Sequence, residues 1–390
     1  MNSFPQKLHD KLNDRKNNQA IRTLKIPNNL VDFSSNDYLG FSISEKIYER
    51  TNHLLQSKNL KANGAKGSRL LTGNHSLYLE TEEFISTLYT QEAALIFNSG
   101  YDANLGLLSS IPQRGDIILY DDLIHASLRD GISMSHANAY KFKHNDLKDI
   151  QTLCTRIKNK RHVSNADPIE IYVVTESVFS MDGDSPDLNT LASYCQENNL
   201  KLIVDEAHAV GIFSLGLVHQ LKLEDKVFAT ILTFGKGLGC HGAAILGSKL
   251  LKEFLVNFSR SFIYTTALPP HSVATIYSAL QQLKLESEKE DSEIQKLNSN
   301  ILFFKNELQQ LDLDKHFIAS NSAIQCCIIS GNEKVKNCSE ALIKEGYDVK
   351  AILSPTVSEE KERLRFCLHS YNSEEEISGV LKTLKKVLIQ

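Results

Sequence analysis

The stretch Thr233-Phe234-Gly235-Lys236-Gly237-Leu238-Gly239 decides how this chain is interpreted. It follows an apolar run at residues 227–232, which predicts a buried strand that ends at Thr233. A single lysine then stands among glycines. Glycine lets backbone and a flat ligand approach each other closely, and a lysine amine in such a place can form a Schiff base with a carbonyl. The stretch therefore predicts a site for a carbonyl-bearing group at the end of a strand.

A second strand end lies upstream, at Leu-Ile-Val-Asp-Glu-Ala-His, residues 202–208. Asp205 is the first acid after that apolar run, and His208 follows three residues later. Pyridoxal phosphate (PLP) needs a lysine for its aldehyde and a carboxylate for its ring nitrogen. Lys236 and Asp205 therefore predict PLP as the cofactor. His208 either packs in the core or donates to the phenolic oxygen of PLP, and no third ligand accompanies Asp205 and His208, so no metal site is predicted.

Composition narrows the class of protein. The chain has 390 residues, of which 42% are hydrophobic and 23% are charged, with a formal net charge of −4. These values are ordinary for a soluble globular protein with a large core, and the net charge argues against nucleic-acid or anionic-membrane partners. Seven cysteines, without a Cys-x-x-Cys pair, favour reduced thiols in the cytoplasm. The polar first 30 residues lack the apolar core of a signal peptide, and no apolar run reaches the roughly 18 residues of a membrane span.

Strands and helices alternate through the middle of the chain, which predicts an α/β fold with a mostly parallel seven-stranded sheet and helices on both faces. The seven strands are expected at residues 93–97, 116–120, 139–142, 170–176, 200–205, 228–233 and 243–246. We expect an N-terminal helix and arm over residues 1–45, with the helix at 6–22. A large domain over 46–282 and a smaller α+β domain over 283–390, which opens with one long helix at 283–312, complete the prediction.

Ligands bind beyond the carboxyl ends of the strands in open α/β sheets. Six polar residues stand at or just beyond such predicted ends, which is stronger evidence for a site than any one of them. They are Glu176, Ser180, Asp205, His208, Thr233 and Lys236.

Other interpretations compete at several of these positions. Gly237-x-Gly239-x-x-Gly242 matches the dinucleotide-binding string and would suggest a nicotinamide oxidoreductase, but the next residues predict a strand, whereas that motif opens a helix. We expect these glycines to let backbone pass close to a cofactor. His125 could cap a helix, and Ser180 could be a turn residue. Arg363 and Arg365 share one strand face and are either solvated or clamp a substrate carboxylate.

The ordered motifs together resemble the α-oxoamine synthases, PLP enzymes of fold type I, from Arg22 to about Ser370. The matching strings are Ser-Ser-Asn-Asp-Tyr-Leu-Gly at 34–40, Asn-Ser-Gly-Tyr at 98–101, His-Ala-Ser at 125–127, His-Asn-Asp at 144–146, Thr-Glu-Ser-Val-Phe-Ser-Met-Asp-Gly-Asp at 175–184, Asp-Glu-Ala-His at 205–208 and Thr-Phe-Gly-Lys-Gly at 233–237.

The resemblance implies a role for each matching position. Lys236, His125 and Asp205 are implied to be catalytic, with His125 stacked on the PLP ring and Asp205 at its nitrogen. The positions implied to bind the cofactor are Gly100, Tyr101, His125, Ser180, Asp205, His208, Thr233 and Lys236, with Thr265 and Thr266 reaching the phosphate of a neighbouring subunit. Substrate-binding positions are implied at Arg22, Asn36, Thr356, Arg363 and Arg365, of which one of the last two holds a carboxylate.

The resemblance also implies a reaction and a partner. Residues 33–37 and 233–237, running into Gly-Ala-Ala at 242–244, favour the family member that condenses L-alanine with a pimeloyl thioester, carried by coenzyme A or a carrier protein, to give 8-amino-7-oxononanoate for biotin. Family members are homodimers with a shared active site. Tyr78 in place of a frequent histidine, Ala267 in place of a frequent serine, and a short segment before Asp32 depart from the pattern. They leave open a glycine C-acetyltransferase, a 5-aminolevulinate synthase, a serine palmitoyltransferase or a non-catalytic subunit.

Overall fold

The computed structural model describes residues 4–24, 29–161 and 169–389. The chain forms two compact units. The large unit comprises residues 36–180 and 185–295, and the small unit comprises residues 1–35, 181–184 and 296–390. The sequence suggested three consecutive segments, whereas the units join residues 1–35 to the C-terminal part of the chain.

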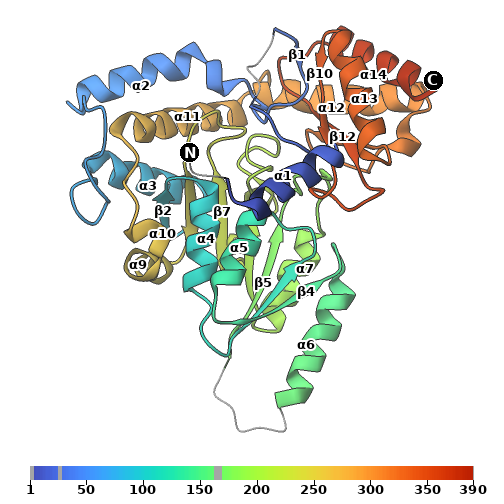
Figure 1. Ribbon diagram of the computed structural model, residues 1–390. Helices are drawn as coiled ribbons and strands as arrows, with labels where there is room; N and C mark the ends of the chain where they lie inside the picture. Colours follow the sequence, from blue (N-terminus) through green and yellow to red (C-terminus); the bar gives the residue numbers. More distant parts are fainter. Residues whose placement is uncertain (1–3, 25–28, 162–168, 390) are drawn as a thin grey trace. The chain divides into compact units, whose positions relative to one another are not determined.

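A seven-stranded sheet forms the centre of the large unit (Figure 1). Its strands follow the spatial order β2-β8-β7-β6-β5-β3-β4, and β8 alone runs antiparallel to its neighbours. The strands are β2 Ala93–Phe97, β3 Ile117–Asp121, β4 Asn138–Phe142, β5 Ile171–Glu176, β6 Lys201–Asp205, β7 Ala229–Thr233 and β8 Ala243–Gly247. The prediction of a mostly parallel seven-stranded sheet is therefore confirmed, with every strand end within one residue of its expected place.

Helices cover both faces of this sheet. The helices of the large unit are α2 Glu45–Ser57, α3 Ser76–Leu88, α4 Gly100–Ser110, α5 Ala126–Met134, α6 Leu147–Arg161, α7 Leu188–Glu197, α8 Leu217–Gln220, α9 Lys249–Phe258, α10 Arg260–Ile263 and α11 Pro270–Glu288. Side chains alternate along each strand. Tyr172 and Val174 of β5 therefore pack in one apolar cluster with α4, α5 and α9, which Figure 1 shows on one side of the sheet. Ile171 and Val173 pack in a second cluster with α6 and α7.

The small unit contains a three-stranded antiparallel sheet with the order β11-β12-β9. Its strands are β9 Ile324–Ile328, β11 Lys350–Ile352 and β12 Arg363–Cys367, and a separate parallel pair joins β1 Val31–Asp32 to β10 Tyr347–Asp348. Its helices are α1 Gln6–Asn17, most of α12 Glu293–Gln310, α13 Asn332–Lys344 and α14 Glu374–Ile389. The rings of Phe304, Phe317 and Phe366 contact one another in its core.

Two predicted helices were wrong in extent. The N-terminal helix ends at Asn17 rather than at residue 22, because the chain turns at Gln19, whose φ of 51° is left-handed. The long helix predicted at 283–312 is two helices, α11 and α12. Side chains satisfy the backbone at the break: Glu286 accepts from the N–H of Glu293 at 2.9 Å, and Ser292 accepts from the N–H of Gln295 at 3.2 Å.

Among the described residues, we find no helix with both the length and the apolar character that crossing a membrane requires.

Candidate active site

Lys236 follows β7 and contacts a histidine from another loop. Its Nζ lies 2.7 Å from Nε2 of His208, and Nδ1 of His208 lies 2.7 Å from the hydroxyl of buried Tyr38. That hydroxyl donates to Oδ1 of Asn36 at 3.2 Å. When Lys236 is protonated, its amine donates to Nε2 of His208, and the ring proton is then on Nδ1. Nδ1 donates to the Tyr38 hydroxyl, which in turn donates to Asn36. This series of contacts with His208, Tyr38 and Asn36 orients the Lys236 amine.

Asp205 ends β6 and is buried. Its Oδ2 accepts from Nδ2 of Asn104 at 2.7 Å, and its Oδ1 accepts from the N–H of Ala207 at 2.9 Å. The adjacent Glu206 has a separate role: it accepts from the N–H groups of Leu217 and Val218 at 3.1 and 3.2 Å. Burial raises the pKa of Glu206 to about 7. Of these two neighbouring acids, Asp205 therefore contacts Asn104, whereas Glu206 contacts the backbone at the start of α8.

His125 precedes α5 and accepts from the N–H of Ser127 at 3.2 Å. Its backbone N–H donates to Oε1 of Glu176 at 2.6 Å. The residue as a whole is exposed. Desolvation of the ring nitrogens and the positive charge of Lys236 lower the pKa of His125, against the opposing charges of Asp205 and Asp130.

Glu176, at the end of β5, is fully enclosed. Burial and the charge of Asp205 raise its pKa to about 8, although Lys236 and the N–H of His125 act in the opposite direction. Near neutral pH the Glu176 carboxyl is therefore mostly protonated. Ser180, a few residues later, is also buried.

The N-terminus of α4 lies beside the end of β7. A Cβ placed on Gly100 would lie 2.5 Å from Oγ1 of Thr233, so only glycine fits there without displacing that hydroxyl. A helix N-terminus with unpaired N–H groups attracts phosphate. Nδ2 of Asn98 donates to Oγ1 of Thr265 at 3.1 Å and to the carbonyl of Thr266 at 2.6 Å, which anchors these threonines to the segment that precedes α4.

The glycines after Lys236 and the side chain of Tyr101 have contacts within the protein. Gly237 packs against the backbone of Val210: a Cβ at residue 237 would lie 2.4 Å from the carbonyl oxygen of Val210, so a larger residue would clash there. Gly239 has a φ of +60°. Both glycines lie against protein backbone. A strand rather than a helix follows them, which excludes the dinucleotide motif. Tyr101 is exposed and its hydroxyl donates to Asp130.

The predicted substrate residues other than Asn36 lie in the small unit. Nη2 of Arg22 lies 3.4 Å from Oγ1 of Thr356. Arg363 is buried in β12, forms an ion pair with buried Asp182 and donates to the carbonyl of Met181 at 2.8 Å. Arg365, on the same face of β12 and also buried, donates to Sγ of Cys367 at 2.9 Å. The two arginines therefore have different surroundings: a carboxylate neutralises Arg363, and a thiol contacts Arg365.

Three residues that contact the predicted site were not assigned a site role from the sequence. Asn104 and Ser127 lie beside Asp205 and His125, and Tyr38 lies beside His208. Asn104 carried a usable signal, since asparagine is unfavourable inside a helix and this one is buried in α4. Tyr38 belonged to a matched motif without an assigned role.

The donor set fits PLP. The large unit presents a lysine amine, a buried carboxylate with two N–H donors, an exposed histidine ring, and a hydroxyl against a helix N-terminus. These are the groups that a PLP aldehyde, ring nitrogen, ring face and phosphate require.

Residues 28–384 match the family of class I and II aminotransferases. The chain belongs to this family. An 8-amino-7-oxononanoate synthase of Emericella nidulans is 37% identical over 98% of this chain and 97% of its own length. A Halalkalibacterium halodurans protein provisionally given the same name is 36% identical over 92% and 87%. The chain is thus an α-oxoamine synthase, most similar to 8-amino-7-oxononanoate synthase.

Solved structures agree on the fold. The 8-amino-7-oxononanoate synthase of Francisella tularensis matches with a TM-score of 0.75 and 26% identity, over 92% of this chain and 98% of that one. Serine palmitoyltransferase from S. paucimobilis, solved with bound PLP, matches with a TM-score of 0.83 and 23% identity, over 98% and 96%. The family has fold type I, and this α-oxoamine synthase is a PLP-dependent transferase.

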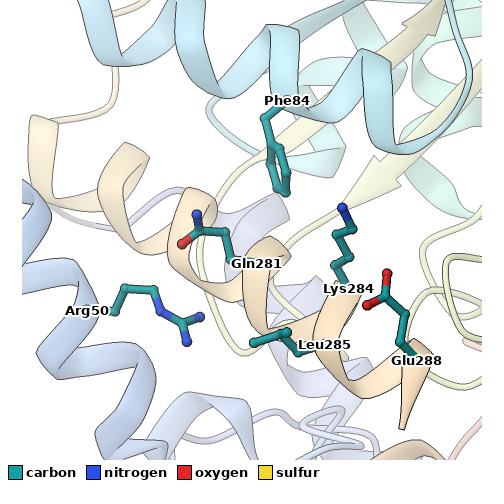
Figure 2. Close-up of a pocket in the computed structure, with 6 residues that line it drawn as sticks. All are labelled: Arg50, Phe84, Gln281, Lys284, Leu285 and Glu288. Carbon is teal, nitrogen blue, oxygen red and sulfur yellow. The ribbon is translucent and has the colours of Figure 1, made fainter.

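A pocket elsewhere in the large unit is separate from these residues. It has a volume of about 440 Å³ and is lined by side chains of α2, α3 and α11, labelled in Figure 2 as Arg50, Phe84, Gln281, Lys284, Leu285 and Glu288. Arg50 donates to the carbonyl of Ser278 at 3.2 Å and to Gln282 at 3.5 Å. None of the lining residues belongs to the predicted cofactor or substrate set, so this pocket is not the candidate active site.

Proposed function

We propose that this enzyme condenses L-alanine with a pimeloyl thioester to give 8-amino-7-oxononanoate, carbon dioxide and the free thiol. A bond forms between Cα of alanine and the thioester carbonyl carbon, and the C–S bond breaks. The Cα–carboxylate bond then breaks, and a proton returns to Cα. The observation that carries the proposal is the 37% identity to an 8-amino-7-oxononanoate synthase over 98% of this chain.

The large unit supplies the residues that hold PLP in this proposal. Lys236 holds the aldehyde carbon, Asp205 the ring nitrogen, and His208 and Ser180 the phenolic oxygen. His125 covers the ring face, and Gly100 with Thr233 faces the phosphate. When bound, PLP supplies an electron sink for negative charge at the substrate Cα.

The chain's own groups move the protons and bind the substrate. Lys236 takes the Cα proton of alanine and returns one after carbon dioxide leaves. The 2.7 Å contact with Nε2 of His208 orients the amine for that transfer. Because the Asp182 carboxylate already neutralises Arg363, we assign Arg365 to the alanine carboxylate. Arg22, Asn36 and Thr356 complete the proposed substrate site.

The setting follows from this activity. We propose that the enzyme works in the cytoplasm, in biotin synthesis, as a homodimer with a shared active site in which Thr265 and Thr266 serve the neighbouring subunit. Coenzyme A or a carrier protein delivers the acyl group, and neither nucleic acid nor a membrane takes part.

Thiol release by the pure enzyme tests the substrates. Pimeloyl-CoA, or pimeloyl carrier protein, is offered with alanine, glycine or serine in separate reactions. Alanine-dependent release supports the proposal. Release only with glycine or serine, or only with another acyl thioester, would assign the enzyme to a sibling activity of the family.

A further inference from the structure

Two side chains without an assigned role connect Asp205 to His125. Nδ2 of Asn104 lies 2.7 Å from Oδ2 of Asp205 and 3.0 Å from Oγ of Ser127. Oγ of Ser127 lies 2.8 Å from Nδ1 of His125. Asn104, Ser127 and Asp205 are all buried, at 2%, 1% and 4% exposure, so water does not compete for these contacts.

Helix packing brings these side chains together. Asn104 lies on α4 and Ser127 in the first turn of α5. One turn after Ser127, a Cβ placed on Gly131 would lie 2.8 Å from the carbonyl oxygen of Asn104. The two helices can approach this closely only because residue 131 is glycine.

The direction of the hydrogen bonds follows from the donors available. An ionised Asp205 carboxylate accepts only, so the amide of Asn104 presents its NH₂ group to it. The second N–H of the same NH₂ group donates to Oγ of Ser127. The Ser127 hydroxyl then has its own proton to donate, and Nδ1 of His125 receives it together with the backbone N–H of Ser127 at 3.2 Å. Nδ1 thus faces two donors, and the neutral ring carries its proton on Nε2.

Charged groups around His125 come from four elements. Lys236 follows β7 and opposes protonation of the ring, while Asp205 of β6 and Asp130 of α5 favour it. Glu176 of β5 accepts from the backbone N–H of His125. Desolvation, the largest influence, lowers the pKa of His125 and favours the neutral ring. The two donors at Nδ1 then place the proton of that neutral ring on Nε2.

We propose that Asn104 and Ser127 are positioning residues that join the PLP-nitrogen partner Asp205 to His125 and hold His125 as the neutral tautomer with hydrogen on Nε2. The proposal rests on the roles assigned to Asp205 and His125 under the proposed function. A neutral His125 avoids placing a second positive charge against a PLP ring whose nitrogen Asp205 keeps protonated.

A double-mutant cycle on PLP affinity is the first test. Full-length Asn104→Ala, Ser127→Ala and the double variant are compared for their PLP dissociation constants. Loss of a buried hydrogen bond to a carboxylate predicts about 10-fold weaker binding for Asn104→Ala. Ser127→Ala should weaken binding about 3-fold. Because Ser127 reaches Asp205 through Asn104 but contacts His125 directly, the double variant should bind more weakly than Asn104→Ala by less than the 3-fold effect of Ser127→Ala alone. Losses that multiply would overturn the proposal.

Matched controls separate positioning from stability. Ser110→Ala removes a hydroxyl from the far end of α4, where it donates to the carbonyl of Gly106. Asn300→Ala removes a buried asparagine of α12 that donates to the carbonyls of His369 and Asn372. Both controls should keep wild-type PLP affinity, even where Asn300→Ala lowers the melting temperature. Ser127→Thr, which keeps the hydroxyl, should retain most of the affinity.

Nitrogen-15 NMR of histidine-labelled holoenzyme reads the tautomer directly, with the His125 signals assigned from a His125→Gln variant. The expected wild-type result is a proton on Nε2. In Ser127→Ala the ring should titrate at a pH about half a unit higher, because one donor to Nδ1 is lost. A wild-type proton on Nδ1, or an unchanged titration in Ser127→Ala, would contradict the proposal.

These readouts use no substrate, so an error in the proposed acyl donor or amino acid leaves them unaffected. If His125 does not contact PLP, the proposed function has the site wrong. His125→Gln would then leave the visible absorbance of bound PLP unchanged.

Discussion

Two candidate site charges of the large unit and Arg363 of the small unit have different kinds of partner. Lys236 is oriented by a histidine, and Asp205 by an amide and a backbone N–H. Arg363 is instead paired with the carboxylate of Asp182. A neutral partner orients a charge and leaves it available to a ligand, whereas an opposite charge neutralises it. The comparison separates groups placed for chemistry from a group placed for stability.

The largest expected effect is at Lys236. Replacing it with alanine should lower the rate of thiol release by about 10² to 10⁴-fold through loss of proton transfer alone, and further through loss of covalent attachment of PLP. Lys201→Ala is the control: Lys201 forms a 3.6 Å pair with Glu170 and donates to Oδ1 of Asn199 at 3.1 Å, neither of which is a predicted site residue, so its loss should leave the rate unchanged. More than a trace of turnover in Lys236→Ala would refute its role.

Alanine substitutions at Arg363 and Arg365 should have different effects, one on stability and the other on substrate binding. Arg363→Ala leaves the buried Asp182 carboxylate unpaired, which predicts a loss of about 3–5 kcal/mol in the free energy of unfolding. Arg365→Ala should instead raise the KM for alanine by about 10-fold or more, because a charge-assisted contact with the carboxylate is lost.

Urea unfolding and steady-state kinetics measure these two effects. Arg363→Met combined with Asp182→Asn is the control, since removing both charges should recover part of the stability. The contrast between the two arginines breaks down if Arg363→Ala alone changes the KM while the protein stays fully stable.

Gly100 tests whether the Thr233 hydroxyl faces the phosphate. A Cβ at residue 100 would lie 2.5 Å from Oγ1 of Thr233 and displace it. Gly100→Ala should therefore weaken PLP binding by about 10-fold, as expected for one lost hydrogen bond to a charged group. Gly64→Ala is the matched control, because no atom lies within 4 Å of its added Cβ. Equal PLP dissociation constants for the two variants would exclude the phosphate role.

The smallest effect concerns pH and Glu176. Its pKa is about 8 in the folded chain against an ordinary 4.5. Between these values the folded state keeps a proton that the unfolded state has released, so this group makes stability fall as pH rises from about 4.5 to about 8. Glu176→Gln, which stays neutral and can still accept from the N–H of His125, should flatten that slope. Its gain in the free energy of unfolding over wild type, measured with urea, should grow as the pH rises from about 4.5 to about 8. Parallel slopes for both proteins would contradict the assignment.

Much of the fold could be predicted because its signals are local. Most of the seven strands are short apolar runs, and each strand lies within one residue of its predicted ends. The break between α11 and α12 could not be predicted in this way, because it depends on Glu286 accepting from the backbone of Glu293 across the turn. The end of α1 depends on a single left-handed residue, Gln19, whose type does not demand that conformation.

The sequence by itself determined the α/β class, the family resemblance, and Lys236, Asp205 and His208 as candidates, since these stand at strand ends that periodicity reveals. Only the tertiary structure decided their partners. Asn104 and Asp205 are 101 positions apart, and Tyr38 and His208 are 170 apart, yet each pair shares a 2.7 Å hydrogen bond. The same holds for Arg363 and Asp182, whose ion pair joins residues 181 positions apart. Hydrogen bonds and ion pairs act over a few ångströms in space, and separation along the chain does not reveal which side chains the fold brings that close.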